Sequence, residues 1–261
     1  MTTASATAAP DRPLLEVKGV TKRFGAVEAL TDVDFEVHAG EVVALVGDNG
    51  AGKSTLIKAI SGIQPGDEYA ASWDGQSVHL NTPQDATRLG IATVYQDLAL
   101  CDNLDVVANL FLGKEEVEDN VTGVLRTLDE IEMEQRSVEL LKSLAVRTLR
   151  SVRTEVGSLS GGQRQTVAIA RSMLGEPKVV ILDEPTAALG VAQTRQVLDL
   201  ILRLKERGLG VVIISHNILD VFEVADRIIV LRLGRRVAMF KRSEATQDEV
   251  VAAITGADQK R

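Results

Sequence analysis

The residues best suited to chemistry form a glycine-rich run near the start of the chain. Gly47-Asp48-Asn49-Gly50-Ala51-Gly52-Lys53-Ser54 has the spacing G-x-x-x-x-G-K-[ST] of a P-loop. Glycines allow backbone N–H groups to turn inward against phosphate oxygens, and a helix that begins there adds a partial positive charge. We expect Lys53 to reach the β- and γ-phosphates of a nucleotide and Ser54 to hold Mg²⁺. The expected phosphate-binding set is Gly47, Asp48, Asn49, Gly50, Ala51, Gly52, Lys53, Ser54 and Thr55.

Two adjacent acids form a second candidate for chemistry. The apolar run 178–182 is typical of a buried strand, and Asp183 and Glu184 follow it directly. Ligands of open parallel sheets bind at the carboxyl ends of the strands. Asp183 is therefore placed to hold Mg²⁺, and Glu184 to polarise an attacking water. Taken alone, adjacent acids after a strand are more simply a capped or solvated turn, and it is the P-loop in the same chain that favours the catalytic interpretation.

Gln96 and His216 each follow a further apolar run that resembles a strand. The runs are 91–95 and 211–214. The Gln96 amide offers an acceptor for Mg²⁺ and a donor for water, and its simpler role is that of a polar strand end. His216 is one of three histidines, and a lone histidine is more often structural.

The elements that must position these residues alternate along the chain. Residues 41–46 are predicted to form a strand, and residues 53–61 a helix that ends at Gly62. Helices and strands then follow in turn over 163–174, 178–182, 191–207, 211–214, 218–225 and 227–231. Such alternation indicates a parallel sheet with crossover helices. Near the N-terminus, Val33, Phe35 and Val37 alternate with polar residues as in a half-exposed strand, and Asp74-Gly75 predicts a hairpin turn.

Residues 103–145 differ from this alternation. The apolar residues there recur near a 3.6-residue period, which predicts helices: Val124, Leu125, Leu128, Ile131, Val138, Leu141 and Leu144. The acidic stretch 115–119 between them is interpreted as a solvated loop. The sequence therefore predicts a helical insertion within an α/β domain.

Composition bounds the class of protein. The chain has 261 residues with 29 basic and 37 acidic side chains, for a formal net charge of −8, which disfavours a general nucleic-acid-binding role. The single cysteine, Cys101, excludes an internal disulfide and fits a reducing compartment. Residues 1–13, rich in small residues and lacking the pattern of a signal peptide, are expected to be a disordered tail. No apolar run approaches the length of a membrane span.

Leu159-Ser160-Gly161-Gly162-Gln163 resembles the signature motif of ATP-binding-cassette (ABC) ATPases, and it precedes the acidic motif as in that family. The resemblance extends from about Leu15 to Ile254. It implies that Gln96 is the Q-loop glutamine, His216 the switch histidine, and Phe24 the aromatic that stacks on adenine. It also implies that the signature binds ATP held by the P-loop of another subunit, so that the functional unit is a homodimer. The expected contacts from the signature are Ser160, Gly161, Gly162 and Gln163.

The resemblance implies an α/β fold: a P-loop NTPase (RecA-like) core with an N-terminal antiparallel β subdomain and an α-helical subdomain inserted at about residues 97–165. Residues 14–261 would form this single ATPase domain. The implied cofactors are ATP and Mg²⁺, with Ser54, Gln96 and Asp183 at the metal. The expected catalytic residues are Glu184, His216, Lys53 and Gln96.

Further stretches resemble the monosaccharide-importer branch of the family: 72–75, 92–100, 187–190 and 215–217. They imply a bacterial importer of a fructose- or ribose-like sugar, with integral membrane permease subunits as partners and an extracytoplasmic sugar-binding protein as an indirect one. The chain would then lie at the cytoplasmic face of the inner membrane. Gly190 departs from the family, in which most members carry an acid at that position. Residues 103–112, which follow Gln96, are a candidate docking surface for the permease or, equally, part of the helical core.

Two other classes of function remain open at the level of sequence. A soluble ABC protein that acts on ribosomes or DNA usually has paired cassettes, long coiled coils or basic patches, and this chain shows one cassette and a net negative charge. A P-loop kinase for a small molecule would explain Lys53 and Asp183 but would leave residues 159–163 and His216 without a role. A kinase makes a phosphorylated product, whereas a transporter subunit releases only phosphate.

Overall fold

The computed structural model describes residues 12–119, 126–146 and 148–257, and its centre is a six-stranded sheet. In spatial order the strands are β12 (Arg235–Lys241), β11 (Arg227–Arg232), β3 (Val42–Val46), β10 (Gly210–Ile214), β9 (Val179–Asp183) and β6 (Ile91–Val94). All neighbours pair in parallel except β11 and β12. The predicted parallel sheet with crossover helices is confirmed.

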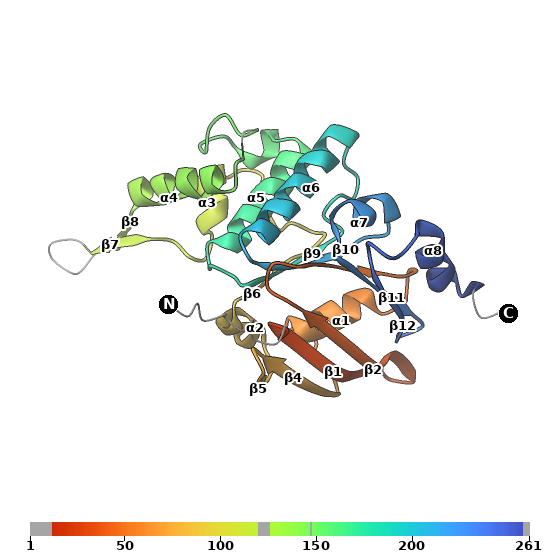
Figure 1. Ribbon diagram of the computed structural model, residues 1–261. Coiled ribbons are helices and arrows are strands. Elements are labelled where there is room, and N and C mark those ends of the chain that lie inside the picture. The colour runs from red at the N-terminus through yellow and green to blue at the C-terminus, as the bar shows by residue number, and fades with distance from the viewer. Residues whose placement is uncertain (1–11, 120–125, 147, 258–261) are drawn as a thin grey trace, which may run out of the picture.

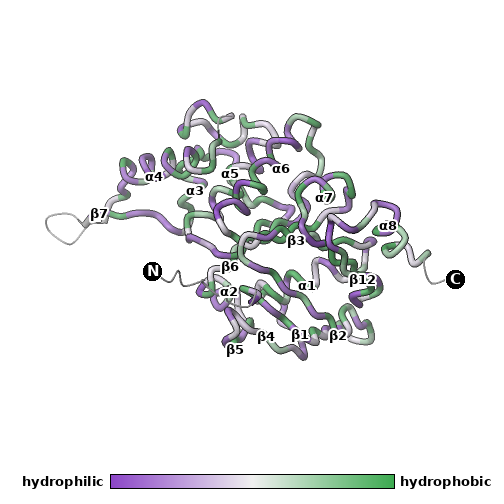
Figure 2. Tube along the Cα trace, in the orientation of Figure 1, coloured by the Kyte–Doolittle hydropathy of each residue, from purple (hydrophilic) through white to green (hydrophobic). Residues whose placement is uncertain are grey.

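The central strands separate two hydrophobic cores, because successive side chains of a strand point to opposite faces. Val42, Ala44 and Val46 of β3 pack on one face with α5 (Gly161–Met173), α6 (Val191–Glu206) and α7 (Ile218–Val224). Val43 and Leu45 pack on the other face with α1 (Lys53–Ile60) and the N-terminal strands. Figure 1 shows α5 and α6 above the sheet and α1 below it. In Figure 2 the chain around β3 is coloured mainly hydrophobic.

The N-terminal strands form a second, antiparallel sheet, as predicted. Its order is β2 (Val27–Val37), β1 (Leu15–Phe24), β4 (Glu68–Trp73) and β5 (Gln76–Val78). Asp74 and Gly75 join β4 to β5 with φ angles of 47° and 69°, so the predicted hairpin turn is also confirmed. This sheet covers α1 and thereby fixes the helix that follows the P-loop.

Residues 103–145 are only partly helical. They contain α3 (Val106–Phe111) and α4 (Glu130–Ser143), but also two short strands, β7 (Val117–Asp119) and β8 (Arg126–Leu128). Residues 115 and 116 form a loop as predicted, but the loop prediction at 117–119 and the helix prediction at Leu128 were wrong. Strands β7 and β8 pair with each other instead, with Val117 opposite Leu128. Val124 and Leu125 lie outside the described residues. Figure 1 shows this hairpin projecting from the side of the molecule.

Two further helices carry capping signals that we did not use to predict them. In α2 (Pro83–Leu89) the Thr82 hydroxyl accepts a hydrogen bond from the Asp85 N–H, and Pro83 occupies the first turn. In α8 (Gln247–Thr255) Thr246 and Glu249 form the same reciprocal pair.

Of the expected tail 1–13, residues 1–11 lie outside the described residues. Arg12 donates a hydrogen bond of 3.1 Å to the Asp74 carbonyl. Across residues 12–119, 126–146 and 148–257, none of the helices combines the length and apolar character that crossing a bilayer requires.

Candidate nucleotide site

Four neighbouring strands end at one edge of the central sheet. Ile214 of β10 pairs with Leu45 of β3 on one side and with Asp183 of β9 on the other, and Val94 of β6 pairs with Leu182. The strands are parallel, so the segments that follow them emerge together. The structure therefore brings the P-loop, the two acids, His216 and Gln96 to one edge, as the sequence predicts.

The P-loop requires glycine at two positions for steric reasons. Gly47 has a φ of 151°, and a Cβ there would lie 2.2 Å from the Leu231 carbonyl oxygen. Gly52 has a φ of 103°, and a Cβ there would lie 2.8 Å from the Ala29 carbonyl oxygen. The loop can thus turn tightly between β3 and α1 only without side chains at these two positions.

Lys53 begins α1 and turns back across the P-loop. Its side chain is buried, and its ammonium group donates to the carbonyls of Gly47 at 2.7 Å and Asp48 at 2.9 Å. Burial lowers the pKa of Lys53, and the charges of Glu184, Asp48 and Asp183 oppose that shift. Those two oxygens satisfy the buried ammonium group.

The rest of the predicted phosphate-binding set ranges from buried to exposed. Asp48, Asn49, Gly50 and Ser54 are exposed, Thr55 and Gly52 are half-buried, and Ala51 is buried. Backbone N–H groups of an exposed loop at a helix N-terminus suit an anion. The Ser54 hydroxyl lies in the first turn of α1 and is an oxygen donor of the kind that Mg²⁺ prefers.

Asp183 and Glu184 occupy different environments although they are adjacent. Burial, with the neighbouring charge of Glu184, raises the pKa of Asp183, and Lys53 and Lys58 oppose that rise. Glu184 has a φ of 48°, in the left-handed region, and its N–H donates to the Ile214 carbonyl at 2.9 Å. This backbone bond to the neighbouring strand holds a conformation that a non-glycine residue rarely adopts.

Glu184 and His216 contact each other directly. The Glu184 carboxylate lies 3.2 Å from His216 Nδ1, and the imidazole is 67% exposed. We predicted both residues separately but not this pairing, because their proximity depends on the register of β9 against β10. The carboxylate thus fixes one imidazole nitrogen and leaves the opposite side of the ring open to solvent.

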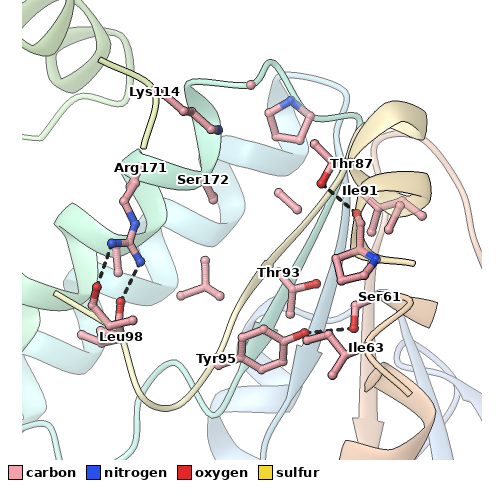
Figure 3. Close-up of a pocket in the computed structure, with 18 of the residues that line it drawn as sticks. Ser61, Ile63, Thr87, Ile91, Thr93, Tyr95, Leu98, Lys114, Arg171 and Ser172 are labelled. Atoms are coloured by element: carbon pink, nitrogen blue, oxygen red, sulfur yellow. Dashed lines mark hydrogen bonds between the residues drawn. The ribbon is translucent and has the colours of Figure 1, made fainter. Parts of the chain in front are cut away.

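Gln96 is exposed at the end of β6, and the backbone after it is held by a residue that we did not predict. Arg171 of α5 donates to the carbonyls of Leu98 and Ala99, each at 2.8 Å (Figure 3). Burial lowers the pKa of Arg171. No local pattern signals this contact, because the acceptors are backbone atoms far away in the sequence.

The signature residues form the N-terminus of α5. The Ser160 hydroxyl accepts from the Gln163 N–H at 3.4 Å, and the Gln163 side chain accepts from the Ser160 N–H at 2.9 Å. The helix begins at Gly161 rather than at the predicted Gln163. A Cβ on Gly162 would lie 2.8 Å from Gln193 Cβ, so the glycine lets α5 approach α6 closely. The Ser160 carbonyl also accepts from the Arg164 N–H at 2.9 Å, as the first bond of the helix ladder.

Phe24 ends β1 and is 45% exposed as a residue. Lys22 places its ammonium 5.8 Å from the ring centroid, a cation–π distance. An exposed aromatic ring at the end of a strand is available for stacking, which is what the proposed contact with adenine requires.

The fold and this edge together define a P-loop NTPase that carries a second helix N-terminus at its signature sequence. The donors fit a magnesium nucleotide: an ammonium and backbone amides for phosphate, and a hydroxyl, an amide and a carboxylate oxygen for the metal. Adjacent to them, a carboxylate held by its backbone is suited to orient water.

Comparison with known proteins defines the family. The family described as ABC transporter matches residues 30–187. The chain is 47% identical to a fructose import ATP-binding protein of Rhizobium meliloti, over 94% of this chain and 95% of that protein. It is 48% identical to a xylose/arabinose import ATP-binding protein of Sulfolobus acidocaldarius, over 93% of this chain and 94% of that protein. A ribose import ATP-binding protein of Rubrobacter xylanophilus is 43% identical, but this chain covers only 47% of its length.

Solved structures agree. An ATP-binding cassette of an ABC transporter in its ADP conformation has a TM-score of 0.78 at 25% identity, with 94% of this chain and 96% of that chain covered. A dimeric cassette in a post-hydrolysis state, bound to ADP and Pi, has a TM-score of 0.71 at 27% identity, covering 87% and 98%. The chain belongs to the ABC transporter family and is an ATPase cassette of it.

Proposed function

We propose that this chain is the ATP-hydrolysing subunit of a bacterial ABC importer and couples ATP hydrolysis to the uptake of a monosaccharide. One observation carries the assignment: a relative named for fructose import matches 94% of this chain over 95% of its own length. Relatives named for xylose/arabinose and for ribose import support the broader class of sugar. We therefore keep a fructose- or ribose-like monosaccharide as the cargo.

At the site, we assign the phosphates to Lys53 and the P-loop amides. Lys53 donates to two P-loop carbonyls, which places its ammonium group within the loop that would hold the phosphates. Ser54, Gln96 and Asp183 are the proposed oxygen donors to Mg²⁺, which when bound would neutralise charge on the transferring phosphoryl group. Glu184 would orient or deprotonate the attacking water. His216, held by Glu184, would hydrogen-bond the γ-phosphate or that water.

The remaining contacts are assigned to a second copy of the chain. We propose that Ser160, Gly161, Gly162 and Gln163 bind the ATP held by the partner, so that a homodimer encloses two identical sites. The supporting observation is that this helix N-terminus lies against the start of α6 and stays outside the hydrogen bonds of the chain's own P-loop. A helix N-terminus capped by serine suits a phosphate group. Phe24 is the proposed stacking partner of adenine.

We propose that the permease docks in a groove of about 350 Å³. The groove lies between β6, α2 and the C-terminal half of α5, and none of residues 47–54 lines it (Figure 3). Of the candidate segment 103–112, only Leu110 and Leu112 reach it. Most of α3 is instead part of the hydrophobic core and is not available to a docking partner. Its buried hydrophobic residues are Val106, Val107, Leu110 and Phe111. Docking there would place the chain at the cytoplasmic face of the inner membrane, with the sugar-binding protein as an indirect partner.

The test of this function measures both products of the reaction. The purified chain is incubated with MgATP and, separately, with fructose, ribose, xylose or arabinose. We expect phosphate release and no phosphorylated sugar. A sugar phosphate would instead establish a P-loop kinase, and co-purification with ribosomes or nucleic acid would favour a soluble cassette protein.

A further inference from the structure

Arg171 belongs both to the signature helix α5 and to the lining of the groove proposed for the permease. It lies on the last turns of α5, the helix whose N-terminus is the signature. Its guanidinium donates to the Leu98 and Ala99 carbonyls at 2.8 Å each. A planar guanidinium that grips two consecutive carbonyls fixes orientation as well as position.

The backbone that Arg171 grips is in a conformation that needs external support. Ala99 has a φ of 47°, which L-residues with a Cβ seldom adopt. The Asp97 carboxylate accepts the Ala99 N–H at 3.1 Å, so contacts fix the turn from both its amide and its carbonyl side. Such conformations persist where the surroundings over-determine them.

This turn follows Gln96 directly and also lines the groove. Asp97, Leu98, Ala99 and Arg171 all face the groove, so a segment that enters it contacts both the turn and its anchor (Figure 3). Gln96 itself lies at the nucleotide edge of β6. Displacement of the turn would therefore move the Gln96 backbone.

We infer that Arg171 is a positioning residue: it holds the turn 97–99 against the signature helix and so transmits occupancy of the groove to Gln96. The inference deepens the proposed function, because it assigns to one contact the coupling between the docking surface and the nucleotide site. Arg171 touches neither nucleotide nor water in this role; it acts through the two carbonyls.

The experiment compares Arg171→Ala, Arg171→Lys and Arg203→Ala in the full chain. Arg203 is a matched control, because it is an arginine of the adjacent helix α6 that also donates to two consecutive carbonyls, those of Leu144 and Ala145. Amide hydrogen exchange over residues 96–101, and kcat and KM for MgATP, are measured on the isolated chain. Stimulation of turnover is measured with the permease complex.

For Arg171→Ala we expect exchange over 96–101 to quicken and kcat to fall, each by about tenfold, with KM for MgATP within about twofold of wild type because the P-loop is intact. Stimulation by the permease should be lost. Lysine, which can reach one carbonyl, should restore part of kcat, and Arg203→Ala should change none of these.

Wild-type exchange and kcat in Arg171→Ala would overturn the inference, as would an equal loss in Arg203→Ala, which would show a general effect of losing a helix-to-loop bond. If Arg171→Ala does not fold, Arg171→Lys decides on the same readouts. A wild-type chain that no permease stimulates would instead count against the proposed importer function, and the measurements on the isolated chain would still decide the role of Arg171.

Discussion

At the scale of single residues, the nucleotide edge contains groups whose placement opposes stability. Asp183 is a partly buried carboxylate beside Glu184, and its pKa is raised. The left-handed backbone of Glu184 and the buried ammonium of Lys53 are further examples. A cluster of residues in unfavourable environments at one edge of a sheet is typical of a functional site.

Asp183→Asn should stabilise the ligand-free chain while removing turnover. Because the pKa of Asp183 is higher in the folded than in the unfolded chain, the charged carboxylate destabilises the fold. This loss of unfolding free energy is complete at a pH above the folded-state pKa, and it disappears as the pH falls through that pKa. We expect a gain in unfolding free energy on the order of 1 kcal/mol at pH 7, reduced by partial solvent exposure, and none near pH 3. Denaturant unfolding with EDTA at both pH values measures it; equal stability at pH 7 would contradict the burial argument.

Glu184→Gln should keep MgATP binding and lose hydrolysis by roughly two orders of magnitude or more, because the amide cannot accept the proton of water. Nucleotide binding and phosphate release are measured on the same preparation. Near-normal turnover would remove Glu184 from the proposed mechanism.

At the scale of elements, the alternating helices and strands between residues 161 and 232 could be predicted to within about two residues, because each buried strand is short, apolar and bounded by polar turns. Strand β12 and helix α8, which follow them, were not predicted. The two short strands at 117–119 and 126–128 could not be predicted. A 3.6-residue spacing of apolar side chains coincided with a hairpin whose strands are too short to show alternation. By contrast, Thr82 and Thr246 carried capping signals that sequence reasoning can use.

Contacts between segments that are distant in the sequence could not be predicted from sequence patterns. The edge that gathers the P-loop, Asp183, Gln96 and His216 was predictable from motif order. The grip of Arg171 on two carbonyls and the pairing of Glu184 with His216 were not, because each depends on the packing of whole elements.

Asn109 shows how one side chain fixes a loop. It is fully buried in α3, accepts from the Cys101 N–H, and donates to the carbonyls of Cys101, Leu104 and Asp105. Asn109→Ala should lower the unfolding free energy by about 2–4 kcal/mol, since it leaves buried backbone groups unpaired. Asn103→Ala, an exposed change in the same loop, is the control in denaturant unfolding; equal stability of both variants would refute this role.

At the scale of the whole molecule, the proposed function requires two copies of the chain. In this proposal one copy supplies Lys53 and the acids, and the signature of the other closes the site. A pair of substitutions at Ser160 tests this arrangement without disturbing the helix. Ser160→Asp keeps a side chain that can cap α5 but would repel the phosphates bound by the partner, whereas Ser160→Asn caps α5 without adding a charge.

In the Glu184→Gln background, we therefore expect MgATP to drive the chain to a dimer in sedimentation velocity. Ser160→Asp should bind MgATP with unchanged affinity and remain a monomer, and Ser160→Asn should still dimerise. Dimers of the Ser160→Asp protein that are as stable as those of the Ser160→Asn protein would place the signature outside the interface.

If ATP hydrolysis at this edge drives sugar uptake through a permease, as we propose, sugar transport should depend on the ATPase activity of this chain. The most direct measurement is ATP-dependent accumulation of labelled fructose, ribose, xylose or arabinose in proteoliposomes that hold this chain with its co-purified permease and binding protein. We expect accumulation of at least one of these sugars with the wild-type chain and of none with Glu184→Gln. Accumulation of none of the four with an ATPase-active wild-type chain, or equal accumulation with Glu184→Gln, would contradict it.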